Sequence, residues 1–200
     1  WQKILNELNG NTTRLKKRYP NTEIKKGKLA VTLKYSDGNE IQLLPAVRRG
    51  SGFKIAQDSS NWSNIVNPKK FALSLRASNI NMSGKLLPVI KLAKSIISKF
   101  PSNRQITGYH TEAAAIKAFS NYKGRKYKKD MLKYFFQAAS NIVMKPIKEK
   151  TGQSVNVDQY LGSDNSLKRK MVADSLAQVN RKMQNADASS LKQKWEEILK

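Results

Sequence analysis

Two lysines, Lys91 and Lys94, lie on the polar edge of an otherwise apolar segment with helical spacing. Residues three apart project from the same side of a helix, so both ammonium groups can reach one anion. A triphosphate carries about four negative charges, and paired lysines on a rigid helix could hold it. Two ordinary surface lysines would show the same spacing, so this interpretation stays open beside the first.

Further basic residues gather in two parts of the chain. From Ser59 to Thr111 there is no Asp or Glu, and this stretch carries Lys69, Lys70, Arg76, Lys85, Lys91, Lys94, Lys99 and Arg104. The run 122–129 combines two tyrosines with Lys123, Arg125, Lys126, Lys128 and Lys129. Such mixtures suit phosphate contacts and base stacking, although a solvated helix face or loop explains either cluster alone. Together they predict an anion-binding surface.

The overall composition supports that prediction and excludes several chemistries. The chain has 38 Lys and Arg against 14 Asp and Glu, a net charge of +24, which attracts nucleic acid, nucleotides or anionic membrane surfaces. It has no cysteine and a single histidine, His110, which excludes thiol catalysis, disulfides and Cys- or His-rich metal sites. No Gly-x-Ser-x-Gly or phosphate-loop motif occurs.

No apolar run reaches membrane-spanning length, and no signal-peptide pattern opens the chain. We therefore expect a cytoplasmic protein with no membrane partner. The first residue is Trp rather than Met, which suggests that the chain starts partway into a longer protein.

The first third of the chain predicts a short helix and a small sheet. Residues 1–8 have helical spacing, and Asn9-Gly10 is a helix-ending pair. The runs 28–35 and 40–44 are rich in strand formers, and the turn residues 36–39 between them predict a hairpin that Pro45 closes. One more short strand is expected over 53–56.

The remainder predicts about five to six helices. Asn67 and Pro68 are typical of a helix start, here continuing to about Arg76. Apolar residues with helical spacing predict further helices over about 86–100, 109–120, 131–143, 167–183 and 191–199. The expected fold class is α+β, with a small antiparallel or mixed sheet in 1–60 and a helical lobe in 61–200.

Six short stretches of the sequence resemble a known protein family, and they occur in the same order as in that family. Residues 35–48 resemble the third catalytic strand of DNA-polymerase-beta-type nucleotidyltransferases. They are most similar to the CD-NTases, bacterial relatives of cyclic GMP-AMP synthase and oligoadenylate synthase that make cyclic oligonucleotides in anti-phage defence (CBASS). The other matching strings are 62–71, 87–94, 107–112, 151–154 and 157–162. The colinear match spans nearly the whole chain and corresponds to the C-terminal two-thirds of such an enzyme.

The resemblance implies a partial nucleotidyltransferase palm followed by a helical lobe, with a nucleoside triphosphate between them. It implies that Lys94, and less strongly Lys91, hold the triphosphate and that Tyr109 stacks on a base. Gly108 stands where relatives often carry a serine near the phosphates. The implied cofactor is Mg²⁺ or Mn²⁺.

Two departures concern the metal site. The family's Asp-x-Asp is absent from the chain, and Gln42 stands where a third acid is expected. Glu40 lies two residues before Gln42 on the same face of the strand. It is therefore the candidate to replace the third acid as the catalytic, metal-binding carboxylate. We therefore expect the 200-residue chain alone to be inactive.

The expected function is synthesis of cyclic di- or oligonucleotides, with an RNA or DNA activator on a basic surface formed by Lys69, Lys70 and the 123–129 cluster. A downstream effector would respond to the product without binding this chain directly. Two alternatives stay open: a non-catalytic RNA- or DNA-binding module on the same scaffold, and a poly(A)- or CCA-type RNA nucleotidyltransferase.

Overall fold

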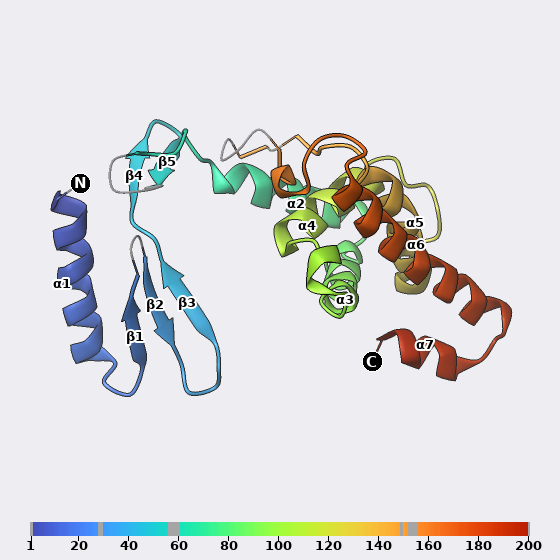
Figure 1. Ribbon diagram of the computed structural model, residues 1–200, viewed down its shortest axis with the longest axis horizontal. Helices are drawn as coiled ribbons and strands as arrows, with labels where there is room; N and C mark the ends of the chain where they lie inside the picture. The colour runs from blue at the N-terminus through green and yellow to red at the C-terminus, as the bar shows by residue number, and fades with distance from the viewer. Residues whose placement is uncertain (1, 28–29, 56–60, 149, 152–155, 200) are drawn as a thin grey trace. The chain divides into compact units, whose positions relative to one another are not determined.

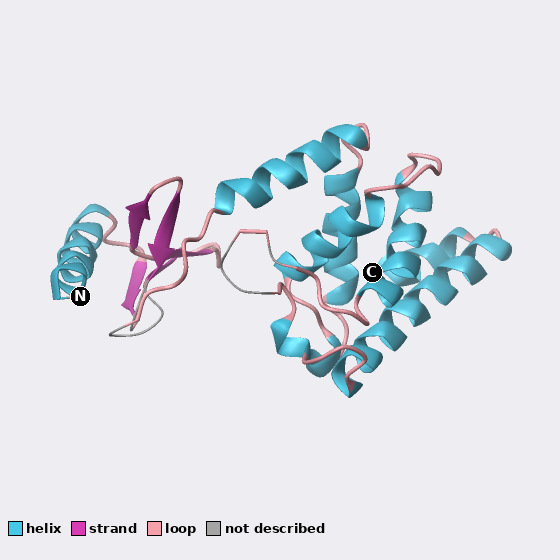
Figure 2. Ribbon diagram, turned by 90° about the horizontal axis from the view of Figure 1, so that it is seen from above, coloured by secondary structure: helices cyan, strands magenta, loops and turns pink. Residues whose placement is uncertain are grey.

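The computed structural model describes residues 2–27, 30–55, 61–148, 150–151 and 156–199. The expectations that fall on Trp1, Lys28, Leu29, Ala56 and 152–155 lie outside the described residues. The chain divides into two compact units, one of residues 1–68 with 151–153 and one of 69–150 with 154–200. All named strands belong to the first unit. Figure 2 draws strands as magenta arrows.

The first unit contains one helix and two small antiparallel sheets (Figure 1). Its elements are α1 (Gln2–Arg18), β1 (Glu23–Lys26), β2 (Val31–Lys34), β3 (Glu40–Leu43), β4 (Ala46–Arg49) and β5 (Gly52–Ile55). The three-stranded sheet has the order β1-β2-β3, and β4 pairs with β5. The small core of the three-stranded sheet consists of Ile24, Val31 and Leu33, and Leu15 of α1 packs against it.

The predicted hairpin is confirmed. Strands β2 and β3 pair with Val31 opposite Leu43 and Leu33 opposite Ile41. The turn between them is held by Asp37, whose carboxylate accepts hydrogen bonds from the backbone and side-chain nitrogens of Asn39. Gly38 has a φ of +85°, the left-handed conformation that glycine adopts without strain.

The predicted end of the first helix is wrong. Helix α1 continues through Gly10 to Arg18. A glycine inside a helix costs about 1 kcal/mol, and packing of Leu15 on the sheet offsets that cost. The last turn carries Lys16, Lys17 and Arg18, whose charges complement the negative end of the helix dipole.

The second unit is helical, as predicted. Its elements are α2 (Pro68–Asn81), α3 (Leu86–Ile97), η1 (Ser102–Arg104), α4 (Gly108–Phe119), α5 (Lys128–Ile142), η2 (Gln159–Leu161), α6 (Leu167–Ala188) and α7 (Lys192–Leu199). Helix α5 lies at the centre, in contact with α3, α4 and α6.

The apolar faces recognised from spacing form one continuous core. Helix α3 buries six side chains, Leu86, Val89, Ile90, Ala93, Ile96 and Ile97. Helix α4 contributes Ala113, Ala114, Ala115 and Ala118, small residues that let neighbouring helices approach closely. This rigid packing fixes the directions of the polar side chains at the helix ends. Within the described residues, no helix has both the length and the apolar character needed to cross a membrane.

Candidate functional site

The N-terminal turn of α4 brings together three residues named from the sequence. Thr107 caps the helix: its Oγ1 accepts a hydrogen bond from the His110 backbone N–H at 3.1 Å, and its carbonyl accepts one from Thr111 N at 2.9 Å. Gly108 and Tyr109 follow as the first helical residues. The amide groups of a helix N-terminus carry partial positive charge, so this turn favours anions.

Lys94 reaches this turn from the last turn of α3. A Cβ added to Gly108 would lie 3.3 Å from Lys94 Nζ, so the ammonium lies directly against the start of α4. Lys94 Nζ also donates to Glu112 Oε1 at 2.5 Å. The Lys94 side chain is 36% exposed and therefore accessible to a ligand. Lys91, on the same helix, is exposed.

Tyr109 borders a separate hollow on α4. Its ring meets Phe71 of α2 edge-on, with ring centroids 4.5 Å apart. The hollow has a volume of about 330 Å³, with walls formed by Phe71, Tyr109, Ala113, Ile116, Ile147 and Val157 and polar groups from Lys117, Ser120, Lys148 and Lys150. Lys94 thus lies against the turn that carries Tyr109, but Lys94 does not line this hollow.

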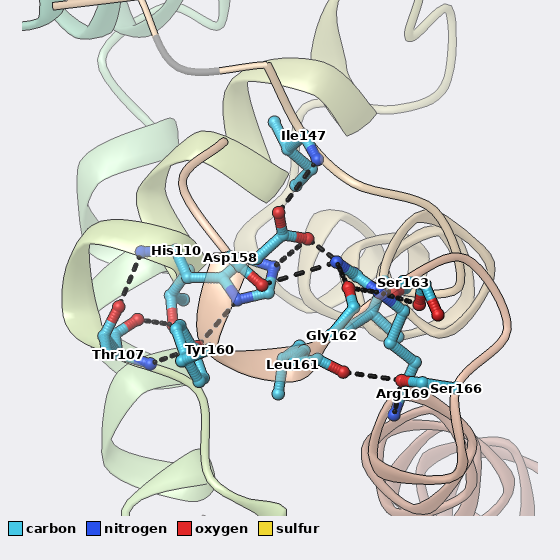
Figure 3. A network of polar contacts seen from close by, with 12 residues as sticks. Thr107, His110, Ile147, Asp158, Tyr160, Leu161, Gly162, Ser163, Ser166 and Arg169 are labelled. Carbon is cyan, nitrogen blue, oxygen red and sulfur yellow. Dashed lines mark hydrogen bonds and ion pairs between the residues drawn. The ribbon is translucent and has the colours of Figure 1, made fainter. Parts of the chain in front are cut away.

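A buried polar network lies behind the turn (Figure 3). The Tyr160 hydroxyl of η2 lies 3.1 Å from Thr107 N and 2.8 Å from His110 Nδ1. His110 is fully buried, and its Nε2 has no hydrogen-bond partner among the described residues. Asp158 Oδ2 lies 3.7 Å from that nitrogen.

Burial keeps His110 neutral. The pKa of His110 is lowered to about 4, chiefly by removal from water; the Asp158 carboxylate offsets part of this effect, and the Arg169 charge adds a smaller lowering. The contact between His110 and Asp158 is therefore not an ion pair near pH 7.

Asp158 and Arg169 form the anchor of the network, and both side chains are fully buried. Asp158 accepts from Ile147 N through Oδ1 at 3.0 Å and from Arg169 Nη1 through Oδ2 at 2.6 Å. Arg169 further donates to the carbonyls of Val143, Gly162 and Ser163. The charge of each residue is thus compensated at close range.

The sequence did not reveal this network. His110 was visible only as the single histidine, and nothing marked Arg169 among 38 basic residues. Tyr160 and Asp158 fall in the resembling string 157–162, which was the one available signal.

Glu40 and Gln42 lie on one face of β3, opposite to Ile41 and Leu43, and both side chains are exposed. Glu40 Oε1 lies 3.8 Å from Lys34 Nζ on the paired strand. Among the described residues, no group of three or more His, Asp or Glu side chains could hold a metal ion. These residues do not fit the expected Mg²⁺ or Mn²⁺ site by themselves.

The predicted nucleic-acid residues fall at opposite ends of α2. Lys69 and Lys70 lie in its first turn, whereas Lys126 Nζ donates to the Asn81 carbonyl at its last residue, at 2.8 Å. With a rise of about 1.5 Å per residue, the two groups are about 17 Å apart along the helix. The structure therefore separates them by the length of α2.

Within the 123–129 cluster, the residues differ in their availability. Lys123, Arg125, Lys126 and Lys128 are exposed, as is Tyr127 at 67%. Lys129 forms an ion pair with Asp187 and lies over the Trp195 ring, 5.0 Å from its centroid. Lys129 is therefore engaged in packing α7 and α6 against α5.

No protein-family model matches the chain, and no curated protein sequence matches it. Solved structures do match its fold. Escherichia coli CdnC, solved in complex with HORMA-deltaN, is 14% identical with a TM-score of 0.74 over 98% of this chain and 71% of CdnC.

Two further matches bind nucleotides in their structures. The Bradyrhizobium diazoefficiens CD-NTase CdnG, in complex with GTP, is 13% identical with a TM-score of 0.68 over 97% of this chain and 70% of CdnG. Escherichia coli DncV in its 3′-deoxy GTP bound form is 9% identical with a TM-score of 0.72 over 96% of this chain and 54% of DncV. The chain therefore has the CD-NTase fold, part of a nucleotidyltransferase palm followed by a helical lobe.

Proposed function

We propose that the chain is part of a nucleotidyltransferase that makes cyclic di- or oligonucleotide signals from ATP- or GTP-type substrates. Residues 1–60 would contribute to the palm and 61–200 would form the lobe. The supporting fold match includes CdnC, solved with ATP, and CdnG, solved with GTP. Anti-phage signalling is the setting that the sequence resemblance implies.

The observation that carries this proposal is the position of the Lys94 ammonium against Gly108 at the start of α4. A cation beside a helix N-terminus combines two sources of positive potential, which a triphosphate would occupy. Lys91, on the same helix and exposed, would add long-range attraction. Tyr109, one residue after Gly108, would stack on the base.

The reaction would be attack of a ribose hydroxyl on the α-phosphate of a bound triphosphate, with release of pyrophosphate. This chain would bind and orient the substrate. Glu40 or Gln42 would stand near the third-acid position, but no metal-dependent step is assigned to the described residues. The requirement for Mg²⁺ or Mn²⁺ stays a prediction.

Calorimetric titration of the 200-residue protein with ATP and GTP tests the binding step. Lys94→Ala should weaken triphosphate binding by about tenfold, the loss of one charge-assisted contact. Lys170→Ala, which removes an equally charged exposed residue of α6, should leave the affinity unchanged. Equal triphosphate affinities for the unsubstituted protein, Lys94→Ala and Lys170→Ala would show that Lys94 does not hold the triphosphate.

Pyrophosphate release tests the catalytic step. The 200-residue protein should release none from ATP or GTP with Mg²⁺, since its described residues contain no metal-binding cluster. Turnover by this protein alone would show that the metal site has been assigned wrongly.

We also propose that RNA or DNA activates the enzyme by binding the exposed part of the 123–129 cluster, with Lys69 and Lys70 as a second contact. The net charge of +24 exceeds what one triphosphate requires. Two groups of cations about 17 Å apart along α2 suit a polyanion better than a mononucleotide.

One alternative has its own supporting observation. Gln42 cannot supply a negative charge, and Glu40 is close to Lys34. A non-catalytic RNA- or DNA-binding module on the same scaffold would need neither a metal nor Lys94. Nucleic-acid binding that is unchanged by Lys94→Ala, in a chain that does not bind ATP, would favour this alternative.

A further inference from the structure

The first turn of α4 is fixed by a residue that lies 53 positions further along the chain. The Thr107 backbone N–H donates to the Tyr160 hydroxyl oxygen at 3.1 Å. This donor precedes the helix, so α4 itself offers it no carbonyl partner. Tyr160 therefore connects η2 to the residue immediately before Gly108.

The same hydroxyl also connects to the other side of the turn. His110 Nδ1 lies 2.8 Å from the Tyr160 oxygen. One hydrogen bond joins this oxygen and Nδ1, and the tautomer of the neutral imidazole sets which of the two donates. One side chain thus holds both Thr107 and His110, the residues that bracket Gly108 and Tyr109.

Tyr160 is itself held rigidly by the buried anchor. Asp158, two residues earlier, bonds to Arg169 and to Ile147 N. Arg169 also donates to the carbonyl of Gly162, two residues after Tyr160. Lys168 Nζ donates to the Tyr160 carbonyl at 2.9 Å. The segment 158–162 is therefore fixed on both sides of Tyr160 (Figure 3).

We propose that the Tyr160 hydroxyl is a positioning group for the triphosphate, acting through the Thr107–Gly108 backbone without touching the nucleotide. This inference rests on the proposed function, because it assumes that phosphates bind beside Lys94 and Gly108. The hydroxyl would keep the first amides of α4 and Gly108 aligned with the Lys94 ammonium, a geometry that two unconnected segments would hold less precisely.

Tyr160→Phe is the direct test, because it keeps the ring and removes only the hydroxyl. Tyr160 is 38% exposed, so the substitution opens no sealed cavity and the fold should persist by circular dichroism. Tyr19→Phe is the matched control: Tyr19 has the same 38% exposure and lies outside the proposed site.

Two measurements separate positioning from a general structural role. Amide hydrogen exchange should accelerate by about tenfold at Thr107 and His110 in Tyr160→Phe and stay unchanged in the core of α5. ATP binding should weaken by about tenfold, whereas adenosine, which lacks phosphates, should bind within twofold of its original affinity. Simple loss of stability would not discriminate between these two ligands.

Each outcome decides a specific point. Unchanged exchange at Thr107, unfolding of Tyr160→Phe, or equal losses for ATP and adenosine would overturn the positioning role. Faster exchange with unchanged ATP affinity would overturn it too, while leaving the proposed function intact. A parent protein with no ATP affinity would instead overturn the proposed function, and the triphosphate role of Tyr160 with it.

Discussion

Lys94 Nζ lies 2.5 Å from Glu112 Oε1, one helical turn after Gly108, against which the same ammonium lies. The strongest candidate for holding a triphosphate therefore already has an anionic partner. Glu112 orients the lysine and at the same time reduces the positive potential at the start of α4. A bound phosphate would compete with this carboxylate.

Glu112→Gln should therefore raise the affinity for ATP. A partly exposed ion pair is worth up to about 1 kcal/mol, so the gain should be about fivefold. Titration calorimetry at fixed ionic strength measures it. Glu196→Gln, which removes an acid that pairs with Lys192 on α7, is the control and should have no effect. Weaker ATP binding by Glu112→Gln would show that orientation by Glu112 outweighs competition.

The buried His110 should make stability depend on pH. Its pKa is lowered to about 4 in the folded state from 6.5, so between these values the unfolded chain binds the proton and the folded chain does not. The contribution of neutral His110 to the free energy of unfolding is fully present above pH 6.5. As the pH falls to about 4, the free energy of unfolding should decrease by about 3 kcal/mol.

Urea denaturation at a series of pH values checks this expectation. The difference between the parent protein and His110→Gln isolates the histidine, because the carboxylates titrate in both. Parallel stability curves for the two proteins above pH 4 would contradict the neutral, buried state of His110.

Loss of Arg169 should destabilise the second unit strongly. Arg169→Met leaves the fully buried Asp158 carboxylate without its cation, and breaking such a pair costs about 3–5 kcal/mol. Arg181→Met, on an exposed position of the same helix, should change the free energy of unfolding by less than about 0.5 kcal/mol. Similar effects of both substitutions would argue against a structural role for the Asp158–Arg169 pair.

Nucleic-acid binding should depend on the exposed cations of the 123–129 cluster. Substitution by alanine of four of them should weaken binding of duplex RNA or DNA: Lys123, Arg125, Lys126 and Lys128. If each contacts one phosphate, the slope of log affinity against log salt should become shallower by about 3.6. Fluorescence anisotropy at salt concentrations from about 50 to 200 mM measures the slope.

The control for this experiment removes the same charge elsewhere. Alanine at four exposed cations outside the cluster should change the slope much less: Lys145, Lys170, Arg181 and Lys182. Equal slopes for the two quadruple variants would show that the attraction is diffuse and that the cluster is not a specific site.

Apolar spacing in the sequence predicted five helices of the helical unit well, because these helices have periodic apolar faces, and the Asn67-Pro68 start predicted α2. It failed for the weaker strands. Strand β1 has a single buried residue, Ile24, and β4 is exposed throughout, so neither shows the alternation that predicts a strand. Helix α1 was cut short at Gly10, because the packing of Leu15 that sustains the helix is a tertiary contact.

The candidate site could be predicted only in part for a similar reason. Lys94, Gly108 and Tyr109 were identified through the resemblance; Gly108 and Tyr109 begin α4, and the Lys94 ammonium reaches Gly108 from the last turn of α3. The partners that fix this turn come from distant segments: Tyr160, Asp158 and Arg169. No local pattern states which of many carboxylates meets which of many cations.

Strand β3 has a further practical consequence. It forms the outer strand of its sheet in the described part of the chain, and Ile41 and Leu43, on the same face as the buried Leu33 and Val31, are 47% and 42% exposed. An open strand edge with apolar residues can pair with a second molecule. Mutual repulsion at +24 opposes such self-association, but salt screens it, with a Debye length of about 10 Å at 0.1 M. Solubility should therefore fall as salt rises, so sedimentation must accompany any salt titration of this protein.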